Sequence, residues 1–136
     1  MRMSPSMSWV LVAVGVLFTV VVFIDLGMRG THRSPPEPHW MVRDGDIQRG
    51  RQAIVDYGCG ACHVIPGIRD ATGRVGPRLT GFREQTYIAG HLANVPENLI
   101  RWIQDPREVA PGTAMPNLGV SEQEARDIAA YLYSSR

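Results

Sequence analysis

Residues 59–63 read Cys59-Gly60-Ala61-Cys62-His63, a C-x-x-C-H pentapeptide that holds both cysteines of the chain. The spacing places two sulfur atoms about one helical turn apart, with an imidazole directly after the second. This arrangement is typical of c-type haem attachment, because each thiol can form a thioether with one porphyrin vinyl group while the histidine lies under the iron. Gly60 and Ala61 keep the intervening side chains small against the macrocycle. The motif therefore predicts one covalent haem c on Cys59 and Cys62, with His63 as an axial iron ligand.

Other uses of the pentapeptide fit the rest of the chain less well. A zinc site needs four ligands, and of the other histidines His32 and His39 lie in a proline-rich stretch, which leaves His91. A thioredoxin-like cysteine pair expects a preceding strand and alternating strands and helices, and no run of the chain shows strand alternation. Haem attachment is the favoured interpretation. A zinc site, a thioredoxin-like pair and a purely structural pentapeptide remain the alternatives.

A six-coordinate haem needs a second axial ligand, and a methionine there raises the reduction potential. Of the six methionines, Met115 alone follows the pentapeptide. It lies in a Pro111-Gly112-Thr113-Ala114-Met115-Pro116 segment, where the prolines stiffen the loop and the glycine permits a close approach. We predict Met115 as the second ligand, with His91 as the rival candidate.

Three helical patterns surround the pentapeptide, with apolar residues at steps of three or four. They cover residues 46–57, 96–104 and 121–134. The second stops before Asp105-Pro106, as the restriction on a residue before proline requires. The third opens with a Ser121-x-x-Glu124 capping box. Long loops at 64–81 and 105–119 are uncommon in a small all-α domain unless they wrap something, so we expect the cofactor to complete the core.

The N-terminal region is predicted to be a membrane helix. No charged residue lies between Arg2 and Asp25, and Trp9–Ile24 is almost wholly aliphatic. About 20 apolar residues span the hydrocarbon of a bilayer. A cleaved signal peptide is the alternative, but the apolar run exceeds its usual ~7–15 residues and no Ala-x-Ala-like site follows. The expected divisions are an anchor at 1–28, a proline-rich spacer at 29–44 and a compact domain at 45–136.

The overall composition excludes two broad classes. The 136 residues carry a formal net charge of +1, with 44% hydrophobic and 20% charged residues. Such values do not fit a highly charged disordered chain or a strongly basic nucleic-acid binder. We find neither a nucleophile–base pair nor a phosphate-binding loop, so we expect an electron-transfer protein rather than an enzyme, with no small-molecule substrate.

The charge around the pentapeptide is locally uneven. From His63 to Arg83 there are four arginines, Arg69, Arg74, Arg78 and Arg83, and one acidic residue, Asp70. A positive rim beside the haem would steer the domain toward an acidic partner face. Dispersed, solubilising arginine is the alternative interpretation.

Taken in order, the motifs from about Gly45 to Arg136 resemble those of a monohaem class I cytochrome c. Gly76-Pro77-Arg78-Leu79 resembles the family's Gly-Pro-x-Leu segment. The resemblance implies that the carbonyl of Pro77 accepts a hydrogen bond from His63 and strengthens it as a ligand. It also implies that the closing helix crosses the first helix where Gly50 allows close contact. The fold class expected is therefore all-α: three main helices and long loops around a covalent haem, preceded by one transmembrane helix.

The resemblance also suggests which further residues line the haem pocket. They are Pro77, Arg78, Tyr87, Trp102 and Thr113. Trp102 stands where the family commonly has tyrosine, which leaves open any hydrogen bond to the methionine sulfur. The loop between Leu79 and Leu99 is short, which leaves the contacts to the haem propionates open, with Arg78, Arg83 and Tyr87 as candidates.

A haem held by His63 and Met115 has no open coordination site, which favours outer-sphere one-electron transfer. More arginines lie on the C-terminal side of the anchor than on its N-terminal side, which favours a cytoplasmic domain. Haem attachment and the resemblance instead favour the outer, periplasmic face of a bacterial inner membrane. The resemblance implies a tethered carrier between a quinol:cytochrome c oxidoreductase and a haem-copper terminal oxidase, or a haem subunit of such an oxidase. A haem c sensor or peroxidase-like module with an open or exchangeable sixth ligand is the alternative, and a purely structural oxidase subunit also stays open.

Overall fold

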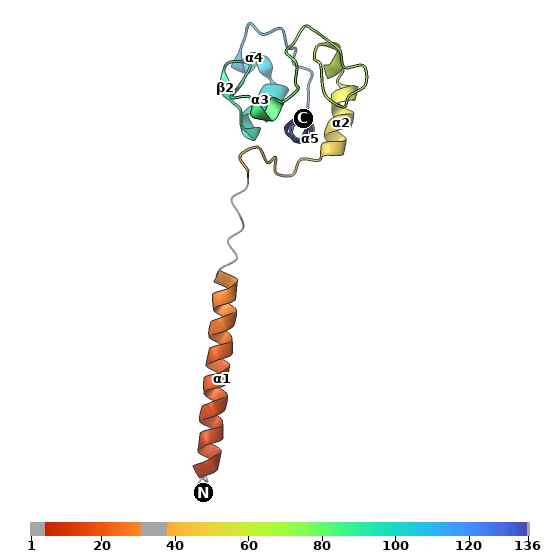
Figure 1. Ribbon diagram of the computed structural model, residues 1–136. Coiled ribbons are helices and arrows are strands. Elements are labelled where there is room, and N and C mark those ends of the chain that lie inside the picture. The colour runs from red at the N-terminus through yellow and green to blue at the C-terminus, as the bar shows by residue number, and fades with distance from the viewer. Residues whose placement is uncertain (1–4, 31–37, 136) are drawn as a thin grey trace. The chain divides into compact units, whose positions relative to one another are not determined.

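The computed structural model describes residues 5–30 and 38–135 (Figure 1). The chain divides into two compact units, residues 1–37 and 38–136, and each is described by itself. Residues 31–37 of the predicted spacer lie outside the described residues.

The first unit contains one long helix, α1 (Pro5–Gly30). Its segment Trp9–Leu26 has a mean hydropathy of 2.6, and none of that segment is buried inside the protein. Thr19 donates its hydroxyl proton to the carbonyl of Val16 at 2.8 Å, so this polar side chain is satisfied within the helix. By length and composition α1 can cross a membrane, because 18 helical residues extend about 27 Å.

The second unit is mostly helical, with long loops over residues 62–81 and 110–121. Its helices are α2 (Ile47–Asp56), α3 (Pro96–Gln104), α4 (Pro106–Val109) and α5 (Glu122–Ser134), with 3-10 turns η1 (Cys59–Ala61) and η2 (Phe82–Glu84). Two strands, β1 (Tyr87–Ile88) and β2 (Leu92–Ala93), pair antiparallel with Ile88 opposite Leu92. The all-α fold class expected from the sequence is confirmed.

The three expected helices are present, and their first turns show why they begin where they do. The carboxylate of Asp46 accepts hydrogen bonds from the backbone N–H groups of Gln48 and Arg49, which caps α2. Ser121 and Glu124 form the expected capping box at α5. The hairpin and the single-turn helix α4 were not expected. Strands of two residues are too short to show alternation, and α4 is one turn begun by Pro106.

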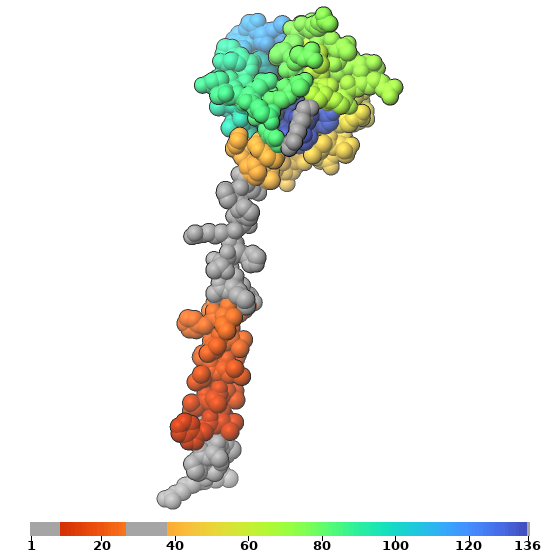
Figure 2. All heavy atoms as spheres, in the orientation of Figure 1, coloured from red at the N-terminus to blue at the C-terminus, as the bar shows by residue number. Residues whose placement is uncertain are grey.

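Helix α5 is the centre of the folded unit and packs against both α2 and α3 (Figure 1). Seven of its thirteen residues are buried, including Ala125 and Ala129, which are fully inaccessible. In Figure 2 only a narrow part of α5, in blue, is visible between the segments that surround it. Small residues allow the neighbouring backbones to approach α5 closely, which a core of this limited size requires.

A buried carboxylate links α2 and α5 through hydrogen bonds at the point where the two helices cross. Asp127 is 2% exposed. It accepts hydrogen bonds from the backbone N–H of Asp46 at 2.7 Å, from Arg49 Nε at 2.8 Å and from Gln123 Nε2 at 3.1 Å. The hydrogen bonds from Arg49 are the main reason that the pKa of Asp127 lies below its usual value. The charged form is therefore the form that the fold stabilises.

Replacing Asp127 by asparagine is expected to destabilise the folded unit by about 1.5–3 kcal/mol at neutral pH, because charge-assisted hydrogen bonds are lost. Since the pKa of Asp127 is lowered in the folded state, its contribution is complete above about pH 5 and disappears as the pH falls through 3.8 and below. Denaturant unfolding of the wild-type and Asp127→Asn proteins at several pH values measures this contribution. The difference between their free energies of unfolding should become smaller in acid.

Glu122→Gln is the matched control, because Glu122 forms an exposed i,i+4 pair with Arg126 on the same helix. An exposed pair contributes at most about 1 kcal/mol. An Asp127→Asn protein as stable as this control across the pH range would contradict the proposed role of the buried carboxylate.

Candidate functional site

An apolar cavity of about 330 Å³ lies in the second unit, and it collects residues from most of the chain after residue 56. Both cysteines of the pentapeptide, His63 and Met115 line it. The remaining wall is largely hydrophobic and comes from η2, β1, α3 and α5, with Phe82, Ile88, Leu99, Ile103 and Leu132 among its residues. A cavity of this volume and character is typical of a ligand or cofactor site.

The cysteines are presented by a short, well-bonded turn. Gly58 adopts φ +67° before η1, a backbone conformation that glycine tolerates best. The backbone N–H groups of Cys62 and His63 both donate to the carbonyl of Cys59, at 3.2 and 3.0 Å. The two sulfurs are not joined in a disulfide, so both thiols are available for other bonds.

The surroundings of these thiols disfavour the alternative uses of the pentapeptide. Burial raises the pKa of the Cys59 thiol, whereas a redox-active or metal-binding cysteine requires a stabilised thiolate. Within residues 5–30 and 38–135, no group of three or more His, Cys, Asp or Glu side chains could hold a metal ion. The described residues therefore offer no cluster for zinc, and burial does not favour a thiolate at Cys59.

The imidazole of His63 is held in a fixed orientation. Its Nδ1 lies 2.7 Å from the carbonyl oxygen of Pro77, which accepts the Nδ1–H hydrogen bond. This is the contact that the family resemblance implies. With its proton on Nδ1, the ring keeps the lone pair of Nε2 free for a metal, and the hydrogen bond increases its donor strength.

Gly76 makes room for that ring. A Cβ on Gly76 would lie 2.3 Å from Cε1 and 2.8 Å from Nε2 of His63. These separations are far shorter than van der Waals contact, so no larger residue fits beside the histidine. The space that the ring needs therefore explains the glycine at position 76, and position 77 contributes its backbone carbonyl.

Met115 reaches the cavity from the loop that follows α4. The backbone N–H of Met115 donates to Oγ1 of Thr113 at 3.2 Å, and the N–H of Thr113 donates to the carbonyl of Ala110 at 2.9 Å. Just before the loop begins, Arg101 of α3 forms an ion pair with Glu108 of α4 at 2.6 Å, which restrains the start of the loop. The loop is thus shaped before any ligand bond forms, which limits the entropy cost of placing a thioether sulfur at a metal.

The other pocket residues expected from the sequence fall into two groups. Pro77, Trp102 and Thr113 line the cavity. Arg78 and Tyr87 are exposed, and neither belongs to its lining. Arg83 packs its guanidinium 4.8 Å from the centre of the Trp40 ring instead. His91, the rival axial ligand, lines a separate cleft and not the cavity that His63 and Met115 share.

Sequence reasoning did not find the hydrophobic walls of the cavity. Tyr57, Phe82 and Leu132 line it and carry no motif. Tyr57 donates its hydroxyl proton to Glu124 at 2.9 Å, which links the cavity wall to the capping box of α5 and raises the pKa of Tyr57. The signal for these residues was only their apolar character, which does not distinguish a cofactor wall from an ordinary core.

Replacing Gly76 by alanine is expected to displace the His63 ring and break its hydrogen bond to Pro77, because the new methyl group overlaps the imidazole. Loss of a hydrogen bond to a ligating histidine typically weakens a metal site about 10-fold to 100-fold. The absorption spectrum of the purified protein and its midpoint potential measure the change. Gly15→Ala in α1 is the control, since a Cβ there also meets no atom within 4 Å. A Gly76→Ala protein with the same spectrum as this control would show that Gly76 does not make room for the His63 ring.

The paired thiols, the oriented histidine and the methionine around one apolar cavity define a protein built to hold a covalent c-type haem. The sequence profile of the family described as cytochrome c matches residues 47–136. The chain therefore belongs to the cytochrome c family, whose members carry haem c covalently and transfer electrons.

Its curated relatives include proteins of two kinds. The chain is 39% identical to cytochrome c oxidase subunit 2 of Alkalihalophilus pseudofirmus over 87 residues, which are 63% of this chain and 25% of the relative. It is 31% identical to the cytochrome c-type cyt cy of Rhodobacter capsulatus, over 65% of this chain and 48% of the relative. The chain thus spans about a quarter of the first relative and about half of the second.

Among solved structures, cytochrome c2 from Rhodobacter sphaeroides is similar. Its sequence is 25% identical, and the match covers 67% of this chain and 96% of that chain with a TM-score of 0.46.

Proposed function

We propose that this chain is a membrane-tethered one-electron carrier whose haem iron is ligated by His63 and Met115. The observation that carries the proposal is the convergence of both side chains on the cavity that Cys59 and Cys62 also line. When bound, the haem supplies an iron that cycles between the ferric and ferrous states. The protein contributes fixed ligands and an apolar wall, which favour small reorganisation during electron transfer.

The proposed ligation favours a carrier over a sensor or peroxidase. Those activities need an open or readily exchanged sixth position, whereas a methionine on a preshaped loop keeps that position filled. Thr113 and the Arg101–Glu108 pair both support the part of the loop that precedes Met115. In the ferrous protein, CO would therefore have to displace Met115 in order to bind.

We further propose the division into an anchor at 1–28, a spacer at 29–44 and a haem domain at 45–136. The apolar helix α1 supports single-pass anchoring. Haem attachment favours the periplasmic, outer side of a bacterial cell membrane for the domain. A tether keeps the carrier at a high local concentration near membrane partners.

The proposed partners are respiratory redox complexes. A relative that carries a matching segment is named cytochrome c oxidase subunit 2, which favours a terminal oxidase as the electron acceptor. The chain would then serve as a mobile donor to the oxidase or as a haem subunit within it, with a quinol:cytochrome c oxidoreductase as the source of electrons.

The test uses the full chain produced in a bacterial host with c-type haem maturation and purified from its membranes in mild detergent. A pyridine haemochrome spectrum should show one haem c per chain, and the ferric protein should show the near-infrared charge-transfer band of His/Met ligation. Absence of the haemochrome would refute haem attachment. A missing near-infrared band together with rapid CO binding would instead support the sensor or peroxidase alternative.

A second measurement tests the partner. Oxidase-containing membranes should oxidise the reduced carrier at a rate that falls as ionic strength rises, if charge steers the encounter. Co-purification of oxidase subunits at fixed stoichiometry would identify an assembled subunit, whereas their absence with fast oxidation would identify a mobile carrier. No oxidation by such membranes would exclude this partner class.

A further inference from the structure

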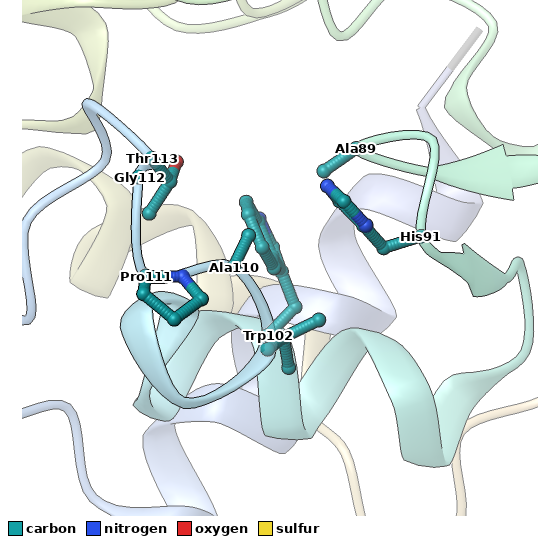
Figure 3. A pocket seen from close by; sticks show the side chains of 8 residues that line it. Ala89, His91, Trp102, Ala110, Pro111, Gly112 and Thr113 are labelled. Carbon is teal, nitrogen blue, oxygen red and sulfur yellow. The ribbon is translucent and has the colours of Figure 1, made fainter.

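A second hollow lies beside the haem cavity, between the β1–β2 hairpin and the loop that follows α4. It is lined by Ala89, His91, Trp102, Val109, Ala110, Pro111, Gly112 and Thr113. Figure 3 shows the Trp102 ring standing between the Pro111–Thr113 segment and the hairpin turn that carries His91. We call this hollow the hairpin cleft.

The hairpin cleft continues the haem cavity on the side away from the cysteines. The two hollows share Ala89, Trp102 and Thr113, but neither cysteine nor His63 lines the cleft. In Figure 1, β2 and α4 lie at the opposite side of the folded unit from α2, which directly precedes the pentapeptide. A planar group attached at Cys59 and Cys62 and lying across the cavity therefore has its far edge toward the cleft.

Trp102 presents an unpartnered donor at this junction. The side chain is only 9% exposed, and no residue in the described part of the chain accepts a hydrogen bond from its indole N–H. The described residues contain no fully buried side-chain nitrogen or oxygen without a partner. The unpartnered indole nitrogen of Trp102 therefore keeps some accessible surface, and Trp102 lines both hollows. An accessible indole N–H without a protein acceptor can donate to a polar group that enters either hollow.

The lining of the cleft contains no carboxylate that would repel an anion. His91 is the one titratable residue among its lining residues, and none of them is acidic. His91 is exposed, and its side chain has no hydrogen-bond partner among the described residues, so a ring N–H can donate to a group in the cleft. A carboxylate placed there would accept one hydrogen bond from the imidazole and one from the indole, with no like charge in the wall.

We propose that His91 and Trp102 bind a haem propionate in the hairpin cleft. A haem carries its two propionates on the pyrroles opposite those that carry the vinyl groups, so attachment at Cys59 and Cys62 directs the propionates to the far edge. The inference rests on covalent haem attachment and on the proposed function. It assigns the propionate contacts to residues other than Arg78, Arg83 and Tyr87, none of which lines the cleft.

The proposal is tested on the full-length haem protein with His91→Ala, and with His39→Ala as the matched control, because His39 is an exposed histidine outside both hollows. Loss of a donor leaves the propionate charge less neutralised, which favours ferric iron. We expect the equilibrium constant for reduction to fall on the order of tenfold, or 59 mV for a one-electron couple. The propionate bending band in the resonance Raman spectrum should shift as well.

Trp102→Phe provides the second arm, because it removes the N–H and keeps most of the ring volume. It should move the same Raman band, and the indole proton of the wild-type protein should exchange slowly with solvent. The proposal is overturned if both variants match His39→Ala in potential and Raman spectrum. Failure of the proposed function would look different, since the haemochrome or the near-infrared band would then already be missing from the unmodified protein.

Discussion

Replacing Met115 by leucine should remove the near-infrared charge-transfer band of the ferric protein and lower the midpoint potential by roughly 0.2 V. Leucine fills nearly the same volume, so the packing of the loop is kept while the thioether sulfur is lost. Met115 is half-buried against the hydrophobic core, and its loop is fixed by Thr113 and Ala110. The expected change is therefore in ligation and not in fold.

The measurements are a spectroelectrochemical titration and CO binding to the ferrous protein, which should become fast once the sixth position is open. Met41→Leu is the matched control, because Met41 is 43% exposed and does not line the cavity. If Met115→Leu keeps the near-infrared band and the wild-type potential, Met115 is not the ligand. A low potential and slow CO binding in the unmodified protein would point to His91 instead.

The helices of the folded unit could be predicted from the sequence because their signals are local. Asp46, Pro96 and Ser121 mark three helix starts through capping or a fixed φ, and each is followed by apolar residues at helical spacing. The hairpin could not be predicted in this way. Ile88 and Leu92 pair across a turn within strands of two residues, so their pairing depends on tertiary context and not on a repeating pattern.

The candidate site could be predicted to the extent that its residues lie in short motifs. The pentapeptide, the Gly76-Pro77 pair and the Met115 loop each have a recognisable order along the chain, and the structure brings all three to one cavity. The prediction of Arg78 and Tyr87 rests on the family resemblance and not on a motif of their own. Adjacent residues can point in different directions, and these two are exposed outside the cavity. His91 was considered as an iron ligand, whereas its cleft favours a different role beside Trp102.

Gly50→Ala is expected to have the second large effect. It should lower the free energy of unfolding of the haem domain by about 3 kcal/mol. Alanine normally stabilises a helix interior relative to glycine by up to about 1 kcal/mol, so helix propensity predicts the opposite sign. Gly50 lies in α2 where that helix crosses α5. A Cβ there would lie 1.9 Å from the carbonyl oxygen and 2.4 Å from the carbonyl carbon of Asp127.

Backbone atoms cannot turn aside as a flexible side chain can, so the two helices would have to separate by roughly 1 Å. That movement would stretch the hydrogen bonds from Asp46 and Arg49 to the Asp127 carboxylate, which fasten the same crossing. It would also disturb two residues that line the cavity. They are Tyr57, which directly follows α2, and Leu132, which lies in α5. Loss of stability should therefore be accompanied by a looser haem pocket.

Denaturant unfolding of the haem protein, followed by far-ultraviolet circular dichroism and by the haem absorption band, measures both effects. Gly112→Ala, which meets no atom within 4 Å, should leave the unfolding midpoint within error of wild type. Because covalent haem attachment does not depend on the crossing, the Gly50→Ala protein should still give a haemochrome spectrum. A Gly50→Ala protein as stable as Gly112→Ala would show that α2 and α5 do not meet at this glycine, and the close packing that shapes the cavity would then need another explanation.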